Sequence, residues 1–552
     1  EVTLGPVRRH LLHRRAARAL EQVQPQPAVR IARHFDRGGN VERALHYYLQ
    51  AVEEARELFA WQEAEGIQSR MLELLDQLDP DRSQPKYLAL RGQILTSRAH
   101  LRYLQGRLGD RDADLATLTS LAERTGDPHL SLEALVHRVR YLNLDAEYEE
   151  ALRVAEEGLA LADHLDRDAT ESRLLAQIGF AHYFLGQPRP ALDALESALA
   201  AVGPDSSPAT RGRIAHILGY VYFHLGEYAR SLEYQEEAYA CHQAMGDHNR
   251  VAWDGLDIGA LHLERGESAV ASQYLTEHLD LARRIGARPA EAYGLTLVGS
   301  WELHQGNYLA AADRFREARS AQQRLRNDHG IVAAELGAGL ALYHLGDLAR
   351  GRRLLRGAVQ QARSIAHRRR LAESLVALGL LETGAASPGA ARSYLLEAVE
   401  LARDGECWES VAAGLAALAR VERTRGNVCD ALDCAGEAIR VARTCELSAV
   451  EVWARTERGL ALLDQGDLTE AVAETGQAVA EVSNLHEAWI GTEQVHRAHA
   501  RVLQALGRTE EAREQARLAD AVIQEKSDRI PDPDTRQRYL QYAQGEALNL
   551  KS

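Results

Sequence analysis

The 552-residue sequence contains few of the residues that build sheets, disulfides and loops. Aromatic residues make up 6% of the chain, and there are only 14 prolines and five cysteines. Strands favour β-branched and aromatic side chains, so this scarcity argues against a β-rich protein. Alanine, leucine, arginine and glutamate dominate instead, as they do in packed helices. The composition therefore predicts an all-α fold.

Signals for cofactors, secretion and membranes are also missing. The cysteines are odd in number and irregularly spaced, which fits neither a disulfide framework nor a metal site; they are Cys241, Cys407, Cys429, Cys434 and Cys445. The sequence has no signal peptide and no apolar run of about 18 residues or more. We expect a cytoplasmic location, no cofactor or metal in this chain, and no membrane contact.

Lysine is nearly absent, since only Lys86, Lys526 and Lys551 occur, and none follows a glycine. A Walker A phosphate loop is therefore excluded, and no hydrolase or metalloprotease motif is present, so we expect no enzyme activity. The formal net charge of −15 argues against direct nucleic acid binding by this segment. Arg14–Arg15 and Arg368–Arg370 are local basic runs, which we interpret as solvated helix faces.

What the sequence does contain is a repeat of 40 residues. When the repeats are aligned, one position in each, which we expect in a turn, is nearly always glycine. The residues in this column, spaced by 40, are Gly106, Ala146, Gly186, Gly226, Gly266, Gly306, Gly346, Ala386, Gly426 and Gly466. Seven residues earlier stands a second small residue, in the column Gly179, Gly219, Gly259, Gly299, Gly339, Gly379, Ala419 and Gly459. Glycine inside a helix costs about 1 kcal/mol relative to alanine, so its recurrence at one position predicts close packing of paired helices.

These columns resemble the tetratricopeptide repeat, in which a small and an aromatic residue on helix A precede a turn and two alanines on helix B. The usual repeat has about 34 residues, so a 40-residue unit should have longer helices and connections. HEAT repeats share a period near 40 but do not predict these small-residue columns. The resemblance implies a right-handed superhelical solenoid of tetratricopeptide-like helix pairs.

The resemblance also implies which side chains face a concave groove. In such arrays these positions lie six and three residues before the helix A glycine, and one, four and five residues after it. Carried over, they predict a ligand-binding groove lined by Arg173, Phe180, Tyr183, Phe184, Arg213, His216, Tyr220, Phe223, His224, Trp253, Glu264, Tyr293, His304, Tyr343 and His344. Aromatic rings with interleaved histidine and arginine suit a ligand with a planar or apolar body and an anionic or hydrogen-bonding edge, and also a peptide. A single aromatic residue at helical spacing would more often be core.

The N-terminal part is similar to the junction at which bacterial STAND ATPases, signal-transduction ATPases with numerous domains, pass from a winged helix to their helical arm. The similarity rests on the helix-like segment 7–21, on Ile31–Phe35, Gly38–Gly39 and Tyr47–Tyr48. The segment from Asp532 to Leu540 also resembles the end of large transcriptional activators of this class, such as the maltose-regulon activator and SARP-like regulators.

This resemblance implies a non-catalytic C-terminal sensor arm, with an ATPase and a DNA-binding module before residue 1. Its partner would be a protein, a peptide or a small-molecule inducer in the groove, and the parent protein could self-associate. A constitutive protein–protein interaction scaffold with no small ligand is the alternative. The expected organisation is the end of a winged helix (1–25), a helical junction with capping helices (26–86), the repeat array (87–525) and a C-terminal capping tail (526–552).

Overall fold

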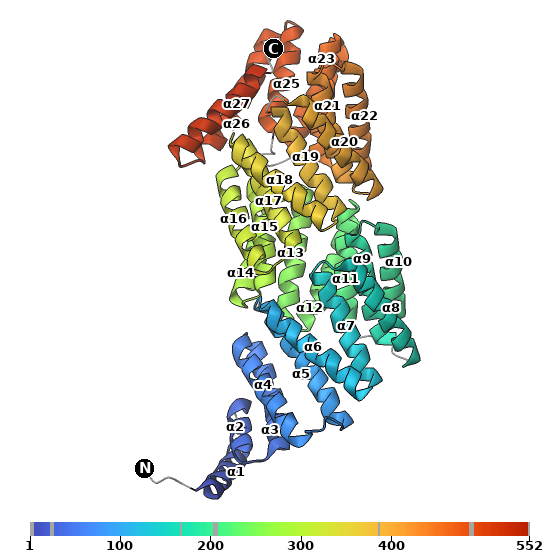
Figure 1. Ribbon diagram of the computed structural model, residues 1–552. Helices are drawn as coiled ribbons and strands as arrows, with labels where there is room; N and C mark the ends of the chain where they lie inside the picture. Colours follow the sequence, from blue (N-terminus) through green and yellow to red (C-terminus); the bar gives the residue numbers. More distant parts are fainter. Residues whose placement is uncertain are drawn as a thin grey trace. The chain divides into compact units, whose positions relative to one another are not determined.

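The computed structural model describes residues 5–22, 27–165, 168–202, 208–384, 387–484 and 491–549. Within these ranges all regular structure is helical, and 27 helices follow one another in antiparallel pairs (Figure 1). None of these described helices is both long and apolar enough to cross a bilayer. The all-α prediction is confirmed.

The first eight helices precede or begin the regular array: α1 (Pro6–Gln22), α2 (Ala28–Arg37), α3 (Val41–Glu57), α4 (Trp61–Leu78), α5 (Pro85–Leu104), α6 (Leu108–Thr125), α7 (Pro128–Leu144) and α8 (Tyr148–His164). The array continues through α9 (Asp168–Phe184), α10 (Pro188–Ala201), α11 (Pro208–His224), α12 (Tyr228–Ala244), α13 (His248–Glu264), α14 (Ser268–Arg284), α15 (Arg288–His304), α16 (Tyr308–Arg324), α17 (Asp328–His344), α18 (Leu348–Ser364), α19 (Arg368–Gly384), α20 (Pro388–Asp404), α21 (Trp408–Thr424), α22 (Val428–Thr444), α23 (Ser448–Gln465) and α24 (Leu468–Asn484). The last helices are α25 (Thr492–Ala505), α26 (Thr509–Asp528) and α27 (Pro533–Asn549).

The 40-residue period has a simple structural basis. From α11 to α22 every helix has 17 residues and three residues separate it from the next, so two helices and two connections make one repeat. Odd-numbered helices in this part are helix A and even-numbered ones are helix B. These lengths account for all 40 residues of the repeat.

The contacts divide the chain into two compact units. Unit 1 comprises residues 1–142, 150–170 and 284–288, and unit 2 comprises 143–149, 171–283 and 289–552. The main cores of unit 1 lie around Phe35 and Met71 and around Leu118. Unit 2 has a chain of cores along the array, the largest of which runs from Val332 to Ala454.

The turn glycines adopt the backbone conformation that the repeat predicts. The described members of the column from Ala146 to Gly466 have φ between 66° and 93°, which favours glycine. Ala386 lies outside the described residues. The connection from helix B to the next helix A also has positive φ, but there the residues include Arg326, Ala366, Glu406 and Glu446, at 51–55°. Glycine spacing alone could not have shown this second turn column.

The second small-residue column marks the contact between helix A and helix B of the same repeat. A Cβ atom on Gly179 would lie 2.5 Å from Leu195 Cγ, and one on Gly339 would lie 2.6 Å from Leu355 Cγ. The same contact, always with the residue 16 positions later, recurs at Gly219, Gly259, Gly299, Gly379 and Gly459. Because such approaches are shorter than any normal Cβ contact, the glycines let the two helices pack closely.

Only some of the polar residues that follow a turn glycine cap the next helix with their side chain. Asp347 accepts a hydrogen bond from the Arg350 amide and so caps α18. Glu227 and Asn307, which stand at the same position before α12 and α16, make no such bond. Among these three residues, only Asp347 caps its helix through a side-chain hydrogen bond.

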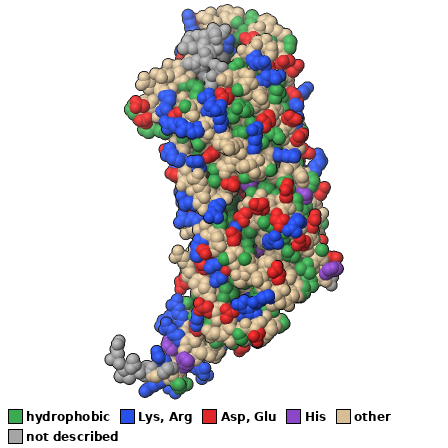
Figure 2. All heavy atoms as spheres, viewed as in Figure 1, with side chains coloured by type: hydrophobic (Ala, Val, Ile, Leu, Met, Phe, Trp, Pro, Cys, Tyr) green, Lys and Arg blue, Asp and Glu red, His purple; other side chains and the backbone are tan. Residues whose placement is uncertain are grey.

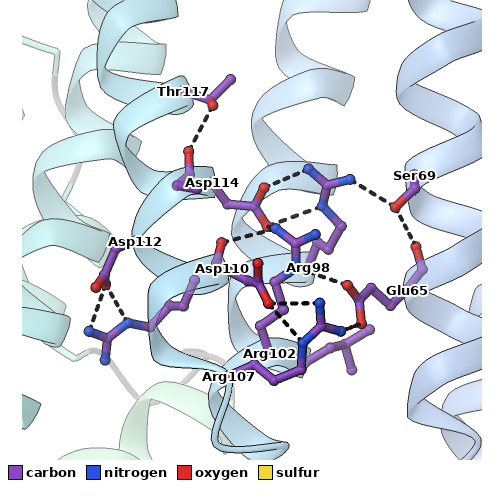
Figure 3. A network of polar contacts seen from close by, with 12 residues as sticks. Glu65, Ser69, Arg98, Arg102, Arg107, Asp110, Asp112, Asp114 and Thr117 are labelled. Carbon is purple, nitrogen blue, oxygen red and sulfur yellow. Dashed lines mark hydrogen bonds and ion pairs between the residues drawn. The ribbon is translucent and has the colours of Figure 1, made fainter.

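A network of charged side chains connects three helices of unit 1. Arg98 and Arg102 on α5 contact Asp114 on α6 at 2.5 and 2.7 Å, and Arg102 also reaches Glu65 on α4 at 3.0 Å (Figure 3). Arg111 stands at the helix B position that Ala191, Ala271 and Ala311 occupy in later repeats; it is 2% exposed and pairs with Asp112. These ion pairs bind α4, α5 and α6 together, so we assign the network a structural role.

Candidate functional site

Two contacts in unit 2 join helices that are far apart in the sequence. The Tyr148 hydroxyl lies 2.6 Å from His329 Nε2, and Arg369 Nη1 donates a hydrogen bond to the Tyr183 hydroxyl at 3.2 Å. The partners are 181 and 186 residues apart. At 40 residues per repeat, this separation corresponds to about five repeats. Successive turns of the repeat array in unit 2 therefore touch each other.

The C-terminal helices make contacts of the same kind. Lys526 on α26 donates to the Tyr308 hydroxyl at 3.1 Å and to Glu493 Oε2 at 2.8 Å, and its side chain is 1% exposed. Arg529 donates to the Gln305 carbonyl oxygen at 2.6 Å, across 224 residues. The buried lysine thus holds α26 against a repeat about five units earlier in the chain.

These contacts bring side chains from several repeats, most of them on helix A, into one aromatic cluster. Tyr183 stacks on His224, with ring centroids 5.2 Å apart, and meets Tyr220 edge-on at 5.4 Å. Phe184 lies 5.4 Å from His329 and 5.5 Å from His367. The aromatic cluster, as we use the term, comprises Tyr148, Phe180, Tyr183, Phe184, Tyr220, His224, His329 and His367. All of them except Tyr148 and His367 are partly exposed.

A group of charged side chains adjoins the aromatic cluster. Arg369 and Arg370 both bond Glu373, each at 2.7 Å, although their side chains are only 13% and 27% exposed. Burial alone would raise the pKa of Glu373, but the two guanidinium groups outweigh it and lower the pKa to about 2. Glu409 lies 3.9 Å from Arg369. With Glu264, these residues form what we call the charged group.

Glu264 is the member of the charged group that no other described residue pairs. It makes no hydrogen bond or ion pair with the described residues, and it is only partly exposed. Burial raises its pKa well above the ordinary value, and the charges of Glu409 and Glu373 raise it further. An interior carboxyl without a partner is a group that a ligand could satisfy.

A third set of side chains connects α11, α12 and α13. Asp254 is fully buried and lies 2.9 Å from His216 Nδ1 and 2.6 Å from His242 Nδ1. Burial alone would raise the pKa of Asp254, but the two imidazole groups outweigh it and lower the pKa. Burial raises the pKa of Asp257 to about 6, against the opposing effects of His216 and of the Tyr293 hydroxyl, which donates to it at 2.8 Å. The two aspartates, three residues apart, therefore have opposite electrostatic environments.

The structure brings some of the predicted groove residues together and separates others. Phe180, Tyr183, Phe184, Tyr220 and His224 share the aromatic cluster. Trp253 stacks on Tyr293 at 5.0 Å, next to Asp257, and Phe223 contacts His224 at 4.7 Å.

The remaining predicted residues lie elsewhere in unit 2. Tyr343 is 5% exposed and belongs to a hydrophobic core. His344 stacks on Tyr308 at 4.8 Å, and burial lowers its pKa to about 4. His304 bonds a backbone carbonyl in its own helix at 3.0 Å. Arg173 and Arg213 are partly exposed on α9 and α11.

Sequence reasoning missed most of the partners that complete the site. The interpretation of Arg368–Arg370 as a solvated face is wrong for Arg369 and Arg370, which are mostly buried and lie against the preceding turn of the array, whereas Arg368 is exposed. His329 is the second residue of α17 and His367 directly precedes α19, so both lie outside the groove positions used for the prediction. A pattern that repeats every 40 residues does not predict contacts between residues about five repeats apart.

The face shown in Figure 2 carries interspersed acidic and basic side chains. Pairs within one helix are common, such as Arg153 with Glu150 at 2.6 Å and Arg508 with Glu511 at 2.5 Å. Exposed ion pairs of this kind contribute about 0–1 kcal/mol each to folding stability, so we interpret this face as an ordinary solvated surface.

One comparison with known proteins, the match to a protein family, supports the repeat. Residues 210–284 match the model of the tetratricopeptide repeat family. A search of curated proteins finds no match. Similar solved structures include a Rap protein complexed with competence and sporulation factor, at 12% identity and a TM-score of 0.41, covering 72% of this chain and 99% of that one. The Cut9–Hcn1 hetero-tetramer of the APC/C is similar at 14% identity and a TM-score of 0.47, covering 98% and 97%.

A third similar structure is BtubC from P. vanneervenii, at 19% identity and a TM-score of 0.32, covering 41% of this chain and 92% of that one. Together with the helix geometry, the family match establishes a tetratricopeptide-like helical repeat. These matches do not test the resemblance to STAND-type regulators, which stays a prediction.

Proposed function

We propose that unit 2 is a binding module whose recognition surface is the aromatic cluster and the charged group. Helical-repeat arrays use their inner surfaces for binding, and here inner positions of several helices A converge. The observation that carries the proposal is the carboxyl of Glu264, which has no partner among the described residues and lies in the electrostatic environment of Glu373 and Glu409. Glu373 pairs with Arg369, which in turn bonds Tyr183 of the aromatic cluster. Aromatic walls with a few polar groups are typical of ligand sites.

The finer proposal is that the chain is the sensor arm of a STAND-type ATP-dependent transcriptional regulator. Binding would favour one of two states of the parent protein, because the surface joins helices that are about five repeats apart. A ligand that contacts both turns of the array binds more tightly when they touch than when they separate. Differential affinity of this kind is what an allosteric sensor requires.

The test for a ligand is a thermal-shift screen of cellular metabolites against the chain and two variants. Tyr220→Ala removes a ring from the aromatic cluster, and Glu264→Gln removes the unpaired carboxyl. Tyr234→Ala is the matched control, because Tyr234 stacks on Tyr222 at 5.6 Å, outside the cluster. A compound that stabilises the wild type and the Tyr234→Ala control, but neither Tyr220→Ala nor Glu264→Gln, supports the proposal. Compounds that stabilise all four proteins equally would contradict it.

A constitutive scaffold is the second candidate, and the tetratricopeptide match of residues 210–284 favours it equally. The parent gene distinguishes the two. A Walker A motif encoded before residue 1, with ATPase activity that responds to the screened ligand, supports the sensor arm. A parent protein without that motif, bound to one partner protein under all conditions, supports the scaffold.

A further inference from the structure

Unit 1 contains a cavity that is lined by residues of its first four helices. The cavity has a volume of about 270 Å³ and is open to solvent. Its lining includes Arg14 and Arg18 of α1, Phe35 of α2, Val41 and Arg43 of α3, and Leu78 of α4. Three of these side chains are arginines, so the cavity has a basic lining above an apolar floor.

The turn between α2 and α3 places Arg14 at this cavity. A Cβ atom on Gly38 would lie 2.9 Å from Arg14 Cγ, so glycine at this position lets α1 pass close to the turn. Gly39 follows with a φ of 70°, a conformation that favours glycine. Arg14 Nε donates to the Gly38 carbonyl oxygen at 2.6 Å, and the guanidinium group makes no other hydrogen bond with the described residues. Its remaining donors are therefore available to a ligand.

Arg18 follows Arg14 by one helical turn and also lines the cavity. Both side chains are exposed, and neither has an acidic partner among the described residues. Residues 23–26, which follow α1 and lie outside the described ranges, include no acidic residue. The two arginines of α1 thus bring two uncompensated positive charges to the cavity.

Two carboxylates beside the cavity are already paired with other basic groups. Glu21 lies 3.2 Å from the third arginine, Arg43, whose guanidinium group also covers the ring of Phe35 at 5.0 Å. Glu42 lies 3.4 Å from Lys86 on α5. These pairs leave the charge of the α1 arginines in excess.

The first turn of α3 adds hydrogen-bond donors to the same cavity. The side chain of Asn40 accepts from the Arg43 amide at 3.3 Å and so caps the helix. The amides of Val41 and Glu42, which also line the cavity, have no acceptor among the described residues. Amides at a helix N-terminus attract anions, because their N–H groups and the helix dipole both favour negative charge.

From this arrangement of arginines around a cavity we infer that unit 1 binds a small phosphate-bearing molecule. Guanidinium groups bind phosphate through parallel charge-assisted hydrogen bonds. The two positive charges of Arg14 and Arg18 match the charge of about −1.5 to −2 that a phosphate ester carries near neutral pH. This site lies within unit 1, is separate from the surface proposed for unit 2, and goes beyond the proposed function.

The test is calorimetric titration of the whole chain with sodium phosphate and with sodium pyrophosphate, at an ionic strength held constant with sodium chloride. We expect saturable binding of at least one of these anions. Arg14→Gln and Arg18→Gln should each weaken it at least about tenfold, because charge-assisted hydrogen bonds are lost. Arg15→Gln is the matched control, since Arg15 is an exposed arginine of the same helix that does not line the cavity. It removes the same charge and should leave the affinity unchanged.

Thermal unfolding of the ligand-free variants guards against a trivial loss of binding. Arg18→Gln should keep the thermal midpoint of the wild type, because Arg18 has no partner among the described residues. A lower midpoint would show that Arg18 stabilises the fold and would contradict its assignment to a ligand. Absence of saturable binding for both anions, or equal weakening by Arg15→Gln, would overturn the inference.

Discussion

Asp257 and Asp254 lie on the same helix, yet replacing them with asparagine should change stability in opposite directions. Asp257 is 6% exposed, and burial raises its pKa to about 6 from an ordinary value of 3.8. The folded protein therefore holds a proton that the unfolded chain releases, and ionisation above pH 6 costs folding free energy. A shift of about two pKa units corresponds to about 3 kcal/mol.

Asp257→Asn should remove this cost while keeping the bond from the Tyr293 hydroxyl. The variant should gain about 1 kcal/mol at pH 4.5 and about 3 kcal/mol at pH 7.5, because the wild-type penalty grows with ionisation between the two pKa values. Urea unfolding followed by circular dichroism measures the difference. Asp433→Asn, at an exposed position on α22, is the control and should change stability by less than about 0.5 kcal/mol at both pH values.

Asp254→Asn should instead destabilise the folded protein. The pKa of Asp254 is lowered because His216 and His242 outweigh the effect of burial, so its stabilising effect is present at neutral pH and is lost as the pH falls through the lowered pKa. Breaking a buried pair of this kind costs about 3–5 kcal/mol. If Asp257→Asn destabilises the protein at pH 7.5, or if its effect does not depend on pH, the account of this network is wrong.

Two further substitutions test the packing. Gly219→Leu should cost about 1–3 kcal/mol by overpacking, because a Cβ there would lie 2.8 Å from Gln235 Cγ, and an unchanged urea midpoint would show that the column is not a helix contact. Lys526→Met should cost about 3–5 kcal/mol by leaving Glu493 buried and unpaired, and adding Glu493→Gln should restore most of it; no recovery in the double variant would contradict a buried ion pair.

The local architecture was readable from the sequence because it repeats. Gly179 and Gly339 mark the contact between helix A and helix B, and the turn column marks positive φ, since both depend on neighbours within one repeat. The second turn was not readable, because Arg326 and Glu446 take positive φ without glycine.

The predicted groove residues make up only part of the candidate site. Tyr183, Tyr220 and His224 share the predicted groove positions on helix A and contact one another, because these side chains belong to adjacent repeats. Arg369 and His329 come from a later turn of the array, and how many repeats make one turn depends on small rotations that accumulate from repeat to repeat. A pattern of spacings within the repeat contains no measure of that rotation.

The most direct test of the account asks whether successive turns of unit 2 touch. A Cβ on Gly226 would lie 3.5 Å from Cys445 Cβ, within the range for a disulfide, although the two residues belong to different turns of the array. Gly226→Cys should therefore form an intramolecular disulfide with Cys445 under mild oxidation, detected by mass spectrometry of non-reduced peptides. Gly426→Cys has a matching turn conformation with open space around it and should not form this disulfide. Failure of the Gly226→Cys variant to crosslink, or equal crosslinking in Gly426→Cys, would contradict the convergence of helices on which the proposed site depends.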